Sequence, residues 1–291
     1  MKPNGIALRE DEFVSEALSA DCAMLFRAGV LLESRRTPYQ LIEVYATPQW
    51  GKLLRLDGCN MTSERDEFIY HENLIHPAAL SHPAPRQVLV IGGGDGGAAE
   101  ELLKHPSIEQ VTLVELDEAV MEIAIKHFET VHRGVFDNPK LRIHIGDGFA
   151  FVRDTAQSFD LVVLDLTDQS GPAAGLYTPA MFAACHRVLN LGGLLSLHVG
   201  SPYFHPQRFR HNLGDLAGVF AVVRPYLAYV PTYGAPWGFA TASVTVDPAT
   251  MAAGDFDAAI VARRLPDLQY VNGATLQTGF VLPNFVGTLL R

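Results

Sequence analysis

A glycine-rich segment between two apolar runs limits the possible folds of this chain more than any other feature. Residues 87–91 read QVLVI, an apolar run typical of a buried parallel strand, and the glycine-rich residues 92–97 follow at once. Residues 98–103 read AAEELL and predict the first turns of a helix, with acids where the helix dipole favours them. A second apolar run, 111–114, ends at Glu115. This order predicts the first half of a nucleotide-binding βαβ unit.

The glycines of this segment indicate that a ligand lies against the backbone. A turn this tight requires positive φ at some positions, which glycine adopts at little cost. Gly92, Gly94 and Gly97 match the pattern G-x-G-x-x-G. Glu115 ends the next strand, where it can accept both hydroxyls of a ribose. A glycine-rich turn without a ligand would explain the glycines alone, but the register of strand, helix and terminal acid favours a nucleotide site.

Asp95, inside the glycine-rich segment, indicates which kind of nucleotide fits. A pyrophosphate would lie where this carboxylate lies, and the two would repel each other. The carboxylate of intact S-adenosylmethionine would be disfavoured for the same reason. A ligand whose tail ends in an ammonium group would be attracted. The charge of Asp95 therefore favours an adenosine that carries an amine over NAD.

Apolar runs and amphipathic segments alternate along the rest of the chain, which predicts an α/β fold. The expected architecture is a doubly wound, mostly parallel Rossmann-like sheet of the methyltransferase type, with a small N-terminal antiparallel β domain. The last two strands have no helix between them, so we expect them to be antiparallel. In such a sheet, ligands bind at the carboxyl ends of the strands. The sequence predicts further strands at 141–145, 160–166, 194–199, 222–230 and 239–246, and helices at 117–128, 179–189 and 207–220.

The region before residue 62 predicts a small antiparallel β unit. Residues 39–45 and 51–57 are rich in strand-forming or alternating residues, and Asp57-Gly58 is a hairpin signal. Residues 23–35 read as an extended segment, and residues 1 to about 22 are polar and mixed.

A helix connects this β unit to the glycine-rich segment. Ser63 can cap it, with Asp66 three residues further on, and the prolines at 83 and 85 end it. We therefore expect three parts: an N-terminal β-strand domain over 1–61, a helix and linker over 62–85, and a Rossmann-like catalytic domain over 86–291.

Charge and cysteine usage exclude some classes of protein. The net charge of −10, from 22 basic and 32 acidic residues, argues against binding to nucleic acid or to a membrane surface and is compatible with cationic substrates. Cys22, Cys59 and Cys185 are widely spaced, which is typical of reduced thiols. The chain begins without a signal-like apolar stretch and has no run of transmembrane length, so we expect a cytoplasmic protein.

Acidic residues follow the expected carboxyl ends of several strands. Each one alone has a simple explanation, because acids cap helices and turn chains, and Asp147 could be only an N-cap. Several on one rim would repel each other unless a cation lies among them. No histidine or cysteine is spaced to bind a metal with them, so magnesium and an organic polycation remain the alternatives. The acids are Asp95, Glu115, Asp147, Asp165 and Asp168.

Several motifs together resemble the polyamine aminopropyltransferases, the spermidine synthase family. They are GGGDGG, the upstream TSERDEFIYHE, GDGF and DLTDQSGPA, and the resemblance extends over about residues 37–286, including VPTYGAPWGFATAS and FVLPNFV. It implies transfer of the aminopropyl group of decarboxylated S-adenosylmethionine to an amine, putrescine giving spermidine, with release of 5′-methylthioadenosine. The donor would be a co-substrate, with no further cofactor and no metal. The family habit also implies a homodimer or higher homo-oligomer.

The resemblance also assigns roles to individual residues. Asp165 would be the general base, which makes chemical sense because an amine with a pKa of about 10 is protonated at neutral pH and must lose a proton to attack. The segment 167–177 resembles the family's gate loop. His71, Asp95 and Asp168 would bind the amine, Tyr70 and Tyr233 would line its pocket, and Gln40, Glu115, Asp147, Gly148 and Pro172 would bind the nucleoside.

Three positions depart from the family pattern on the amine side. Met61 and His198 stand where glutamine is usual, and Gln169 replaces a proline. These changes, and the tryptophan in APWGFATAS, leave the acceptor open. The alternatives to the aminopropyltransferase are a methyltransferase that uses intact S-adenosylmethionine and a non-catalytic polyamine-binding relative.

Overall fold

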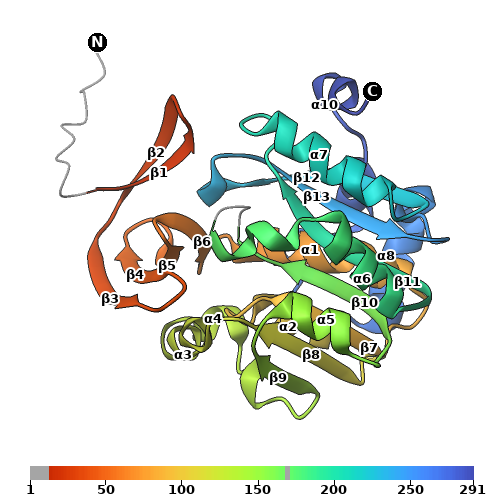
Figure 1. The fold of residues 1–291 in the computed structure, drawn as a ribbon, viewed down its shortest axis with the longest axis horizontal. Coiled ribbons are helices and arrows are strands. Elements are labelled where there is room, and N and C mark those ends of the chain that lie inside the picture. The colour runs from red at the N-terminus through yellow and green to blue at the C-terminus, as the bar shows by residue number, and fades with distance from the viewer. Residues whose placement is uncertain (1–12, 168–170) are drawn as a thin grey trace.

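The computed structural model describes residues 13–167 and 171–291, with side chains described again from residue 173. Within these residues a seven-stranded sheet forms the centre of the molecule, in the order β12-β13-β11-β10-β7-β8-β9 (Figure 1). The five strands from β11 to β9 are parallel, and β13 runs antiparallel to both β11 and β12. The expected doubly wound, mostly parallel sheet with an antiparallel final pair is therefore confirmed. The strands are β7 (Gln87–Gly92), β8 (Gln110–Glu115), β9 (Leu141–Ile145), β10 (Phe159–Asp165), β11 (Leu189–Gly200), β12 (Val222–Val230) and β13 (Ala235–Ser243).

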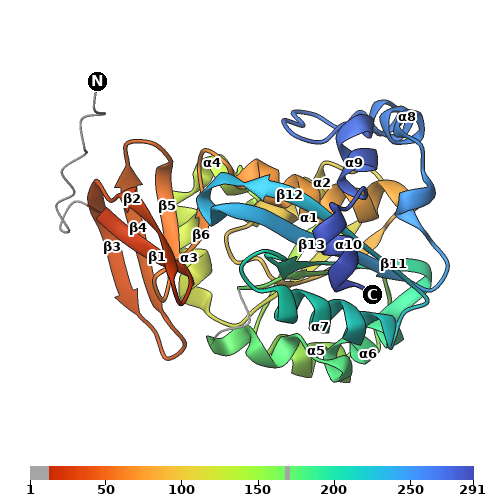
Figure 2. The ribbon, with the colours of Figure 1, turned by 90° about the horizontal axis from the view of Figure 1, so that it is seen from above.

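Helices cover both faces of this sheet because its strands are apolar on both sides. Leu89 and Ile91 of β7 join a core with α5, α6 and α7, whereas Val88 and Val90 join a second core with α1 and α2. Figure 2 shows α5, α6 and α7 along one face. The helices are α1 (Glu67–Ser81), α2 (Gly97–Leu103), α3 (Glu118–His127), α4 (Glu129–His132), α5 (Gly148–Asp154), α6 (Pro179–Val188), α7 (Pro206–Ala217), α8 (Ala253–Arg263), α9 (Gly273–Gly279) and α10 (Asn284–Leu289).

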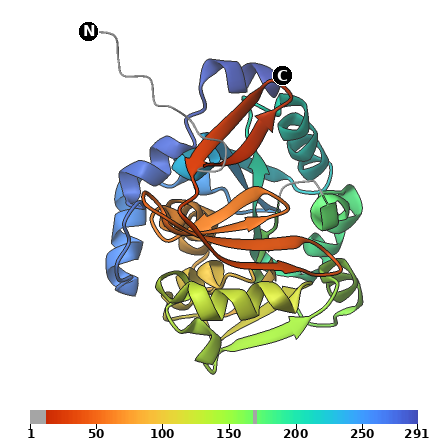
Figure 3. The ribbon, with the colours of Figure 1, turned by 90° about the vertical axis from the view of Figure 1, so that its left-hand side faces the viewer.

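The N-terminal region is a β unit that lies at one end of the large sheet (Figure 3). It consists of a two-stranded hairpin and a four-stranded antiparallel sheet. Asp57 and Gly58 have φ angles of 47° and 82°, as the predicted hairpin turn requires. The first hairpin strand begins at Phe13, within the polar, mixed residues for which no individual strand was predicted. The strands are β1 (Phe13–Ser19), β2 (Cys22–Arg27), β3 (Val30–Arg36), β4 (Leu41–Thr47), β5 (Gly51–Leu56) and β6 (Cys59–Ser63).

Helix α1 begins four residues later than Ser63, because that residue still belongs to β6. Its hydroxyl donates to Asp66 Oδ1 over 2.6 Å, and Asp66 Oδ2 accepts two bonds from Thr232. These two residues therefore fasten the start of the helix to the turn after β12 rather than forming a capping box. From Tyr70 to Leu80 every residue of α1 is buried. The division of the chain into three parts stays a prediction.

Some element boundaries differ from the expected ones. Strand β11 begins five residues before 194, and β13 lies about four residues before the predicted 239–246, because the short turn Pro231–Tyr233 lets Ala235 pair with Val230 at once. Helices α8, α9 and α10 follow, where no element was predicted. In the described part of the chain, no helix combines the length and the apolarity that crossing a membrane requires.

Candidate active site

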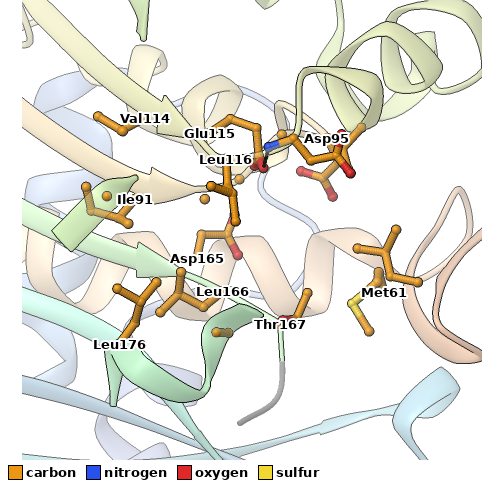
Figure 4. Close-up of a pocket in the computed structure, with 18 of the residues that line it drawn as sticks. Met61, Ile91, Asp95, Val114, Glu115, Leu116, Asp165, Leu166, Thr167 and Leu176 are labelled. Carbon is orange, nitrogen blue, oxygen red and sulfur yellow. Dashed lines mark hydrogen bonds between the residues drawn. The ribbon is translucent and has the colours of Figure 1, made fainter. Parts of the chain in front are cut away.

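A cavity of about 300 Å³ lies at the carboxyl ends of β7, β8 and β10, between the large sheet and the N-terminal β unit (Figure 4). Asp95, Glu115 and Asp165 gather on one side of it, and Met61 of β6 lies across from them. Asp168 lies outside the described residues, as does the side chain of Pro172. The predicted site residues that line the cavity are Gln40, Tyr70, His71, Asp95, Glu115, Asp147, Gly148, Asp165 and Tyr233.

The glycine-rich segment after β7 forms the floor of this cavity for two physical reasons. Gly92, Gly93 and Gly96 have φ angles of 81°, 72° and 83°, which other residues rarely adopt. Gly94 and Gly97 are needed for space, since a Cβ would lie 2.8 Å from Glu115 Oε2 in the first case and 2.2 Å from the His71 ring in the second. The glycines thus let two functional side chains approach the backbone.

Glu115 occupies the expected ribose position at the end of β8. Its Oε1 accepts the backbone N–H of Asp117 over 2.9 Å, and Asp117 Oδ2 accepts from Thr37 Oγ1 at 2.7 Å and from Gln40 Nε2 at 3.0 Å. Burial, reinforced by the charge of Asp117, raises the pKa of Glu115 to about 7. Asp117 was expected only as the start of a helix, although its place two residues after the strand-end acid Glu115 indicates a position close to the cavity.

Asp147 combines the two roles considered for it, because it caps a helix and lines the cavity. Its Oδ1 accepts the backbone N–H of Phe149 at 2.8 Å and of Ala150 at 3.2 Å. A Cβ on Gly148 would lie 2.3 Å from Ile91 Cγ2, so a glycine is required at the first turn of α5. The cap therefore holds the Asp147 carboxylate at a fixed place in the cavity wall.

His71 places a cation among the acids. Its Nδ1 lies 2.7 Å from Glu67 Oε2 and its Nε2 lies 3.5 Å from Asp95 Oδ2. Burial alone would lower the pKa of His71, but the two carboxylates outweigh burial and raise it well above its usual value. Burial would likewise raise the pKa of Asp95, but the charge of His71 and the N–H of Gly97 lower it. The imidazolium therefore keeps Asp95 ionised.

The expectation that no histidine is spaced to bind a metal with the strand-end acids was wrong. Helix α1 brings His71 to Asp95 and Asp165, and ligand-type atoms of the three lie within 4.8 Å of one another, close enough to hold a metal ion. Both imidazole nitrogens already face carboxylates, however, and a protonated imidazole has no lone pair for a metal. The arrangement suits an organic cation better than a metal.

Asp165, the last residue of β10, is the carboxylate best prepared to receive a ligand. Its Oδ1 accepts the hydroxyl of Tyr70 over 2.9 Å. Its Oδ2 is buried and has no hydrogen-bond partner among residues 13–167 and 171–291. Burial and the nearby charge of Asp95 raise the pKa of Asp165 to about 6, against the opposing charge of His71. A buried carboxylate oxygen without a hydrogen-bond donor is unfavourable, so its presence here indicates that a bound ligand supplies the missing donor.

Two of the three residues that depart from the expected pattern, Met61 and His198, lie at or next to the cavity. His198 Nε2 donates to the carbonyl oxygen of Leu166 over 2.8 Å and lies 2.6 Å from the hydroxyl of Tyr177. Met61 lines the cavity, and its carbonyl oxygen accepts the hydroxyl of Tyr233 over 2.6 Å. Gln169 lies outside the described residues. His198 and Met61 thus form part of the wall near Asp165, and neither adds a carboxylate to it.

This chain is similar in sequence to proteins of known family. Residues 67–250 match the model of the spermine/spermidine synthase domain. A polyamine aminopropyltransferase of Nitrosomonas europaea is 46% identical over 99% of this chain and 88% of its own, and one of Hyperthermus butylicus is 40% identical over 93% and 90%.

Solved structures show the same similarity in three dimensions. A spermidine synthase in complex with the transition state analogue AdoDATO superposes with a TM-score of 0.91 at 34% identity, over 97% of this chain and 96% of the other. The spermidine synthase of Thermotoga maritima superposes with a TM-score of 0.88 at 33% identity, over 97% and 95%.

Proposed function

Since the chain belongs to the spermine/spermidine synthase family of polyamine aminopropyltransferases, we propose that it transfers the aminopropyl group of decarboxylated S-adenosylmethionine to putrescine, giving spermidine. The nucleoside would lie on the glycine-rich floor, with its ribose hydroxyls on Glu115 and its adenine beside Asp147. Asp95, ionised next to His71, would hold the ammonium end of the aminopropyl group. The donor is a co-substrate in this scheme, and no further cofactor or metal takes part.

The acceptor amine would bind at Asp165. As a primary ammonium it donates to Oδ2, loses a proton to this carboxylate, and attacks with the freed nitrogen lone pair. A bond forms between this nitrogen and the methylene carbon next to sulfur, while the carbon–sulfur bond breaks and its electron pair goes to sulfur. The sulfonium becomes the neutral thioether of 5′-methylthioadenosine. Most of the rate would come from holding nitrogen, carbon and sulfur in line.

The observation that carries this proposal is the buried Asp165 Oδ2 without a described partner beside an ionised Asp95. The test incubates the protein with decarboxylated S-adenosylmethionine and a panel of amines and measures methylthioadenosine. We expect release with putrescine, and tighter calorimetric binding of the decarboxylated donor than of intact S-adenosylmethionine, because Asp95 repels the carboxylate of the latter. Preference for the intact form would instead support a methyltransferase.

Replacing the proposed base gives a second test. Asp165→Asn keeps the shape of the side chain but cannot take a proton, so we expect kcat to fall about 100-fold or more while donor binding changes little. Asp160→Asn, near the opposite end of β10, is the matched control, because Asp160 accepts the backbone N–H groups of Arg86 and Gln87 and the side-chain amide of Asn190, all away from the cavity. Turnover that survives Asp165→Asn would remove Asp165 from the role of base.

We also propose that two copies associate through the N-terminal β unit. Apolar side chains of β2 and β3 are exposed there: Leu25, Val30, Leu31 and Leu32 are 52%, 62%, 48% and 41% exposed. Leu31→Glu together with Leu25→Glu should lower the molar mass measured by light scattering to that of one chain. An unchanged mass would place the contact elsewhere. Cytoplasmic location stays a prediction.

A further inference from the structure

A second, smaller cavity adjoins the first on the amine side. It measures about 30 Å³, and its lining includes His198 and Trp237. Met61, Tyr70 and Tyr233 line both cavities, together with Leu166 and Thr167. The smaller cavity therefore lies next to Tyr70, whose hydroxyl bonds to the carboxylate proposed to bind the reacting amine.

Four of the rings that line this smaller cavity are neighbours in a cycle. Tyr70 lies 5.9 Å from Tyr233, Tyr233 lies 4.8 Å from Trp237, Trp237 lies 5.7 Å from His198, and His198 lies 6.1 Å from Tyr70, measured between ring centroids. The carboxylate of Glu16, which accepts the backbone N–H of Asn60 over 3.0 Å, lines the same space. Aromatic faces with one carboxylate form a favourable environment for an ammonium group.

We propose that the stacked side chains of His198 and Trp237 are the length stop of the acceptor site, so that a diamine fits and a triamine does not. This inference rests on the proposed function. With one nitrogen of the acceptor at Asp165, the chain would run past Tyr70, and the distal ammonium would end between the four rings. His198 and Trp237 then meet the end of the acceptor.

The volume of the smaller cavity decides which acceptors fit. One water-sized group needs about 10–15 Å³ of such space, so about 30 Å³ admits an ammonium and the methylene next to it. A triamine would add another aminopropyl arm of three methylenes and a nitrogen. That arm fits only if a wall moves.

Contacts outside the smaller cavity hold His198 and Trp237 in place. His198 is 3% exposed, and its Nε2 contacts both the Leu166 carbonyl and the Tyr177 hydroxyl. Trp237 belongs to β13, pairs with Ala228 of β12 and stacks on His198 with an interplanar angle of 29°. Turning the His198 ring would break its buried hydrogen bonds, and turning the Trp237 ring would break its stacking contact with His198.

The test measures kcat/KM of the full chain with decarboxylated S-adenosylmethionine and either diamines of increasing length or the triamine spermidine. For the unaltered protein we expect the triamine to be worse than the best diamine by about 100-fold. Trp237→Ala and, separately, His198→Ala should raise the ratio of triamine to diamine kcat/KM by about tenfold or more. The affinity for the donor, which binds on the other side of Tyr70, should stay unchanged and also reports correct folding.

A matched control lies on the neighbouring strand. Tyr229 of β12 is 55% exposed and pairs with Pro236, next to Trp237, so Tyr229→Ala removes a ring without touching the cavity and should leave the ratio unchanged. The inference is overturned if the unaltered protein uses the triamine as well as a diamine. It is also overturned if the folded variants keep the original ratio; should Trp237→Ala not fold, His198→Ala decides. Absence of turnover with every amine would instead refute the proposed function and this inference with it.

Discussion

Tyr70 contributes to the pKa of Asp165, the residue proposed as the base. A base must be ionised to take a proton, so with a pKa of about 6 for the proposed base we expect activity to be lost as pH falls through about 6. The hydrogen bond from the Tyr70 hydroxyl stabilises the ionised form and lowers this pKa. Tyr70→Phe removes the bond, so we expect the acidic limb of kcat/KM against pH to move to higher pH.

Tyr226→Phe is the matched control for this prediction. Its hydroxyl is also buried, but it donates to the carbonyl oxygen of Asn73, away from Asp165. The variant loses one buried hydrogen bond, worth about 1 kcal/mol of stability, without touching the base. Its acidic limb should coincide with that of the unaltered protein. An acidic limb that stays in place in Tyr70→Phe would mean that another group controls it.

Burial of Glu115, the proposed ribose-binding residue, makes the stability of the folded protein depend on pH. Its pKa rises from an ordinary 4.5 to about 7, so the folded protein binds more protons than the unfolded chain between these values, and stability falls as pH rises through them. Each pKa unit corresponds to about 1.4 kcal/mol, which gives a loss of roughly 3 kcal/mol at most. Glu115→Gln should therefore be more stable than the unaltered protein in urea at pH 8, but not at pH 4.5, and should bind the donor weakly.

Glu118→Gln separates this effect from a simple loss of charge. Glu118 begins α3, three residues after Glu115, but its side chain is exposed. Surface changes of this kind usually alter stability by less than about 0.5 kcal/mol. If both variants respond equally to pH, burial is not the cause of the stability difference.

Sequence reasoning located the acids of the site but not the residues that tune them. Asp95, Glu115, Asp147 and Asp165 could be placed together because the carboxyl ends of parallel strands meet at one edge. The proximity of His71 could not be derived in this way, since it depends on how α1 packs beneath the sheet.

At the scale of elements, α1 holds the C-terminal region through one buried carboxylate. Glu72 accepts the backbone N–H groups of Gln269 at 2.7 Å, Tyr270 at 2.9 Å and Val271 at 2.7 Å. In Glu72→Gln, an amide N–H₂ group replaces one carboxylate oxygen. This group cannot accept a hydrogen bond and would face a backbone N–H group of residues 269–271. We expect a loss of about 3 kcal/mol in urea unfolding and faster hydrogen exchange at 269–271.

Glu129→Gln, on the exposed face of α4, is the control for the loss of a charge. It should change neither urea unfolding nor exchange at 269–271. The glycine-rich floor should also keep its protection in Glu72→Gln, because α2 packs on α1 independently of this carboxylate. Equal exchange at 269–271 in Glu72→Gln and the unaltered protein would show that the carboxylate does not hold this segment.

Elements with a strong local signal were predicted well, and those that depend on distant contacts were not. The strands predicted at 141–145 and 222–230 match the observed bounds, because apolar and polar residues alternate in the first and residues with high strand propensity dominate the second. Strand β1 buries only Val14 and Leu18 fully and is stabilised by pairing with β2. Helix α9 reads GATLQTG, a poor helix former, and its capping residue Asn272 follows the segment that Glu72 binds.

At the scale of the whole molecule, residues of both the N-terminal β unit and the region of the large sheet line the cavity. Gln40 and Met61 come from the N-terminal β unit, whereas Asp95 and Asp165 come from the large sheet. Thr37 and Gln40 reach the large sheet through their bonds to Asp117. A nucleoside bound at Glu115 would therefore contact groups that hold the two units together.

Binding of 5′-methylthioadenosine should consequently protect both units from hydrogen exchange. At a concentration 100 times its Kd, a ligand stabilises the folded state by about 2.7 kcal/mol. We expect slower exchange at 92–97 and 115–117 and, through Asp117, at 37–41 in the N-terminal β unit. Gln40→Ala should lose the protection at 37–41 but keep it at 92–97, since the glycine-rich floor contacts the ligand directly. Protection confined to the large sheet in the unaltered protein would show that the nucleoside does not bridge the two units.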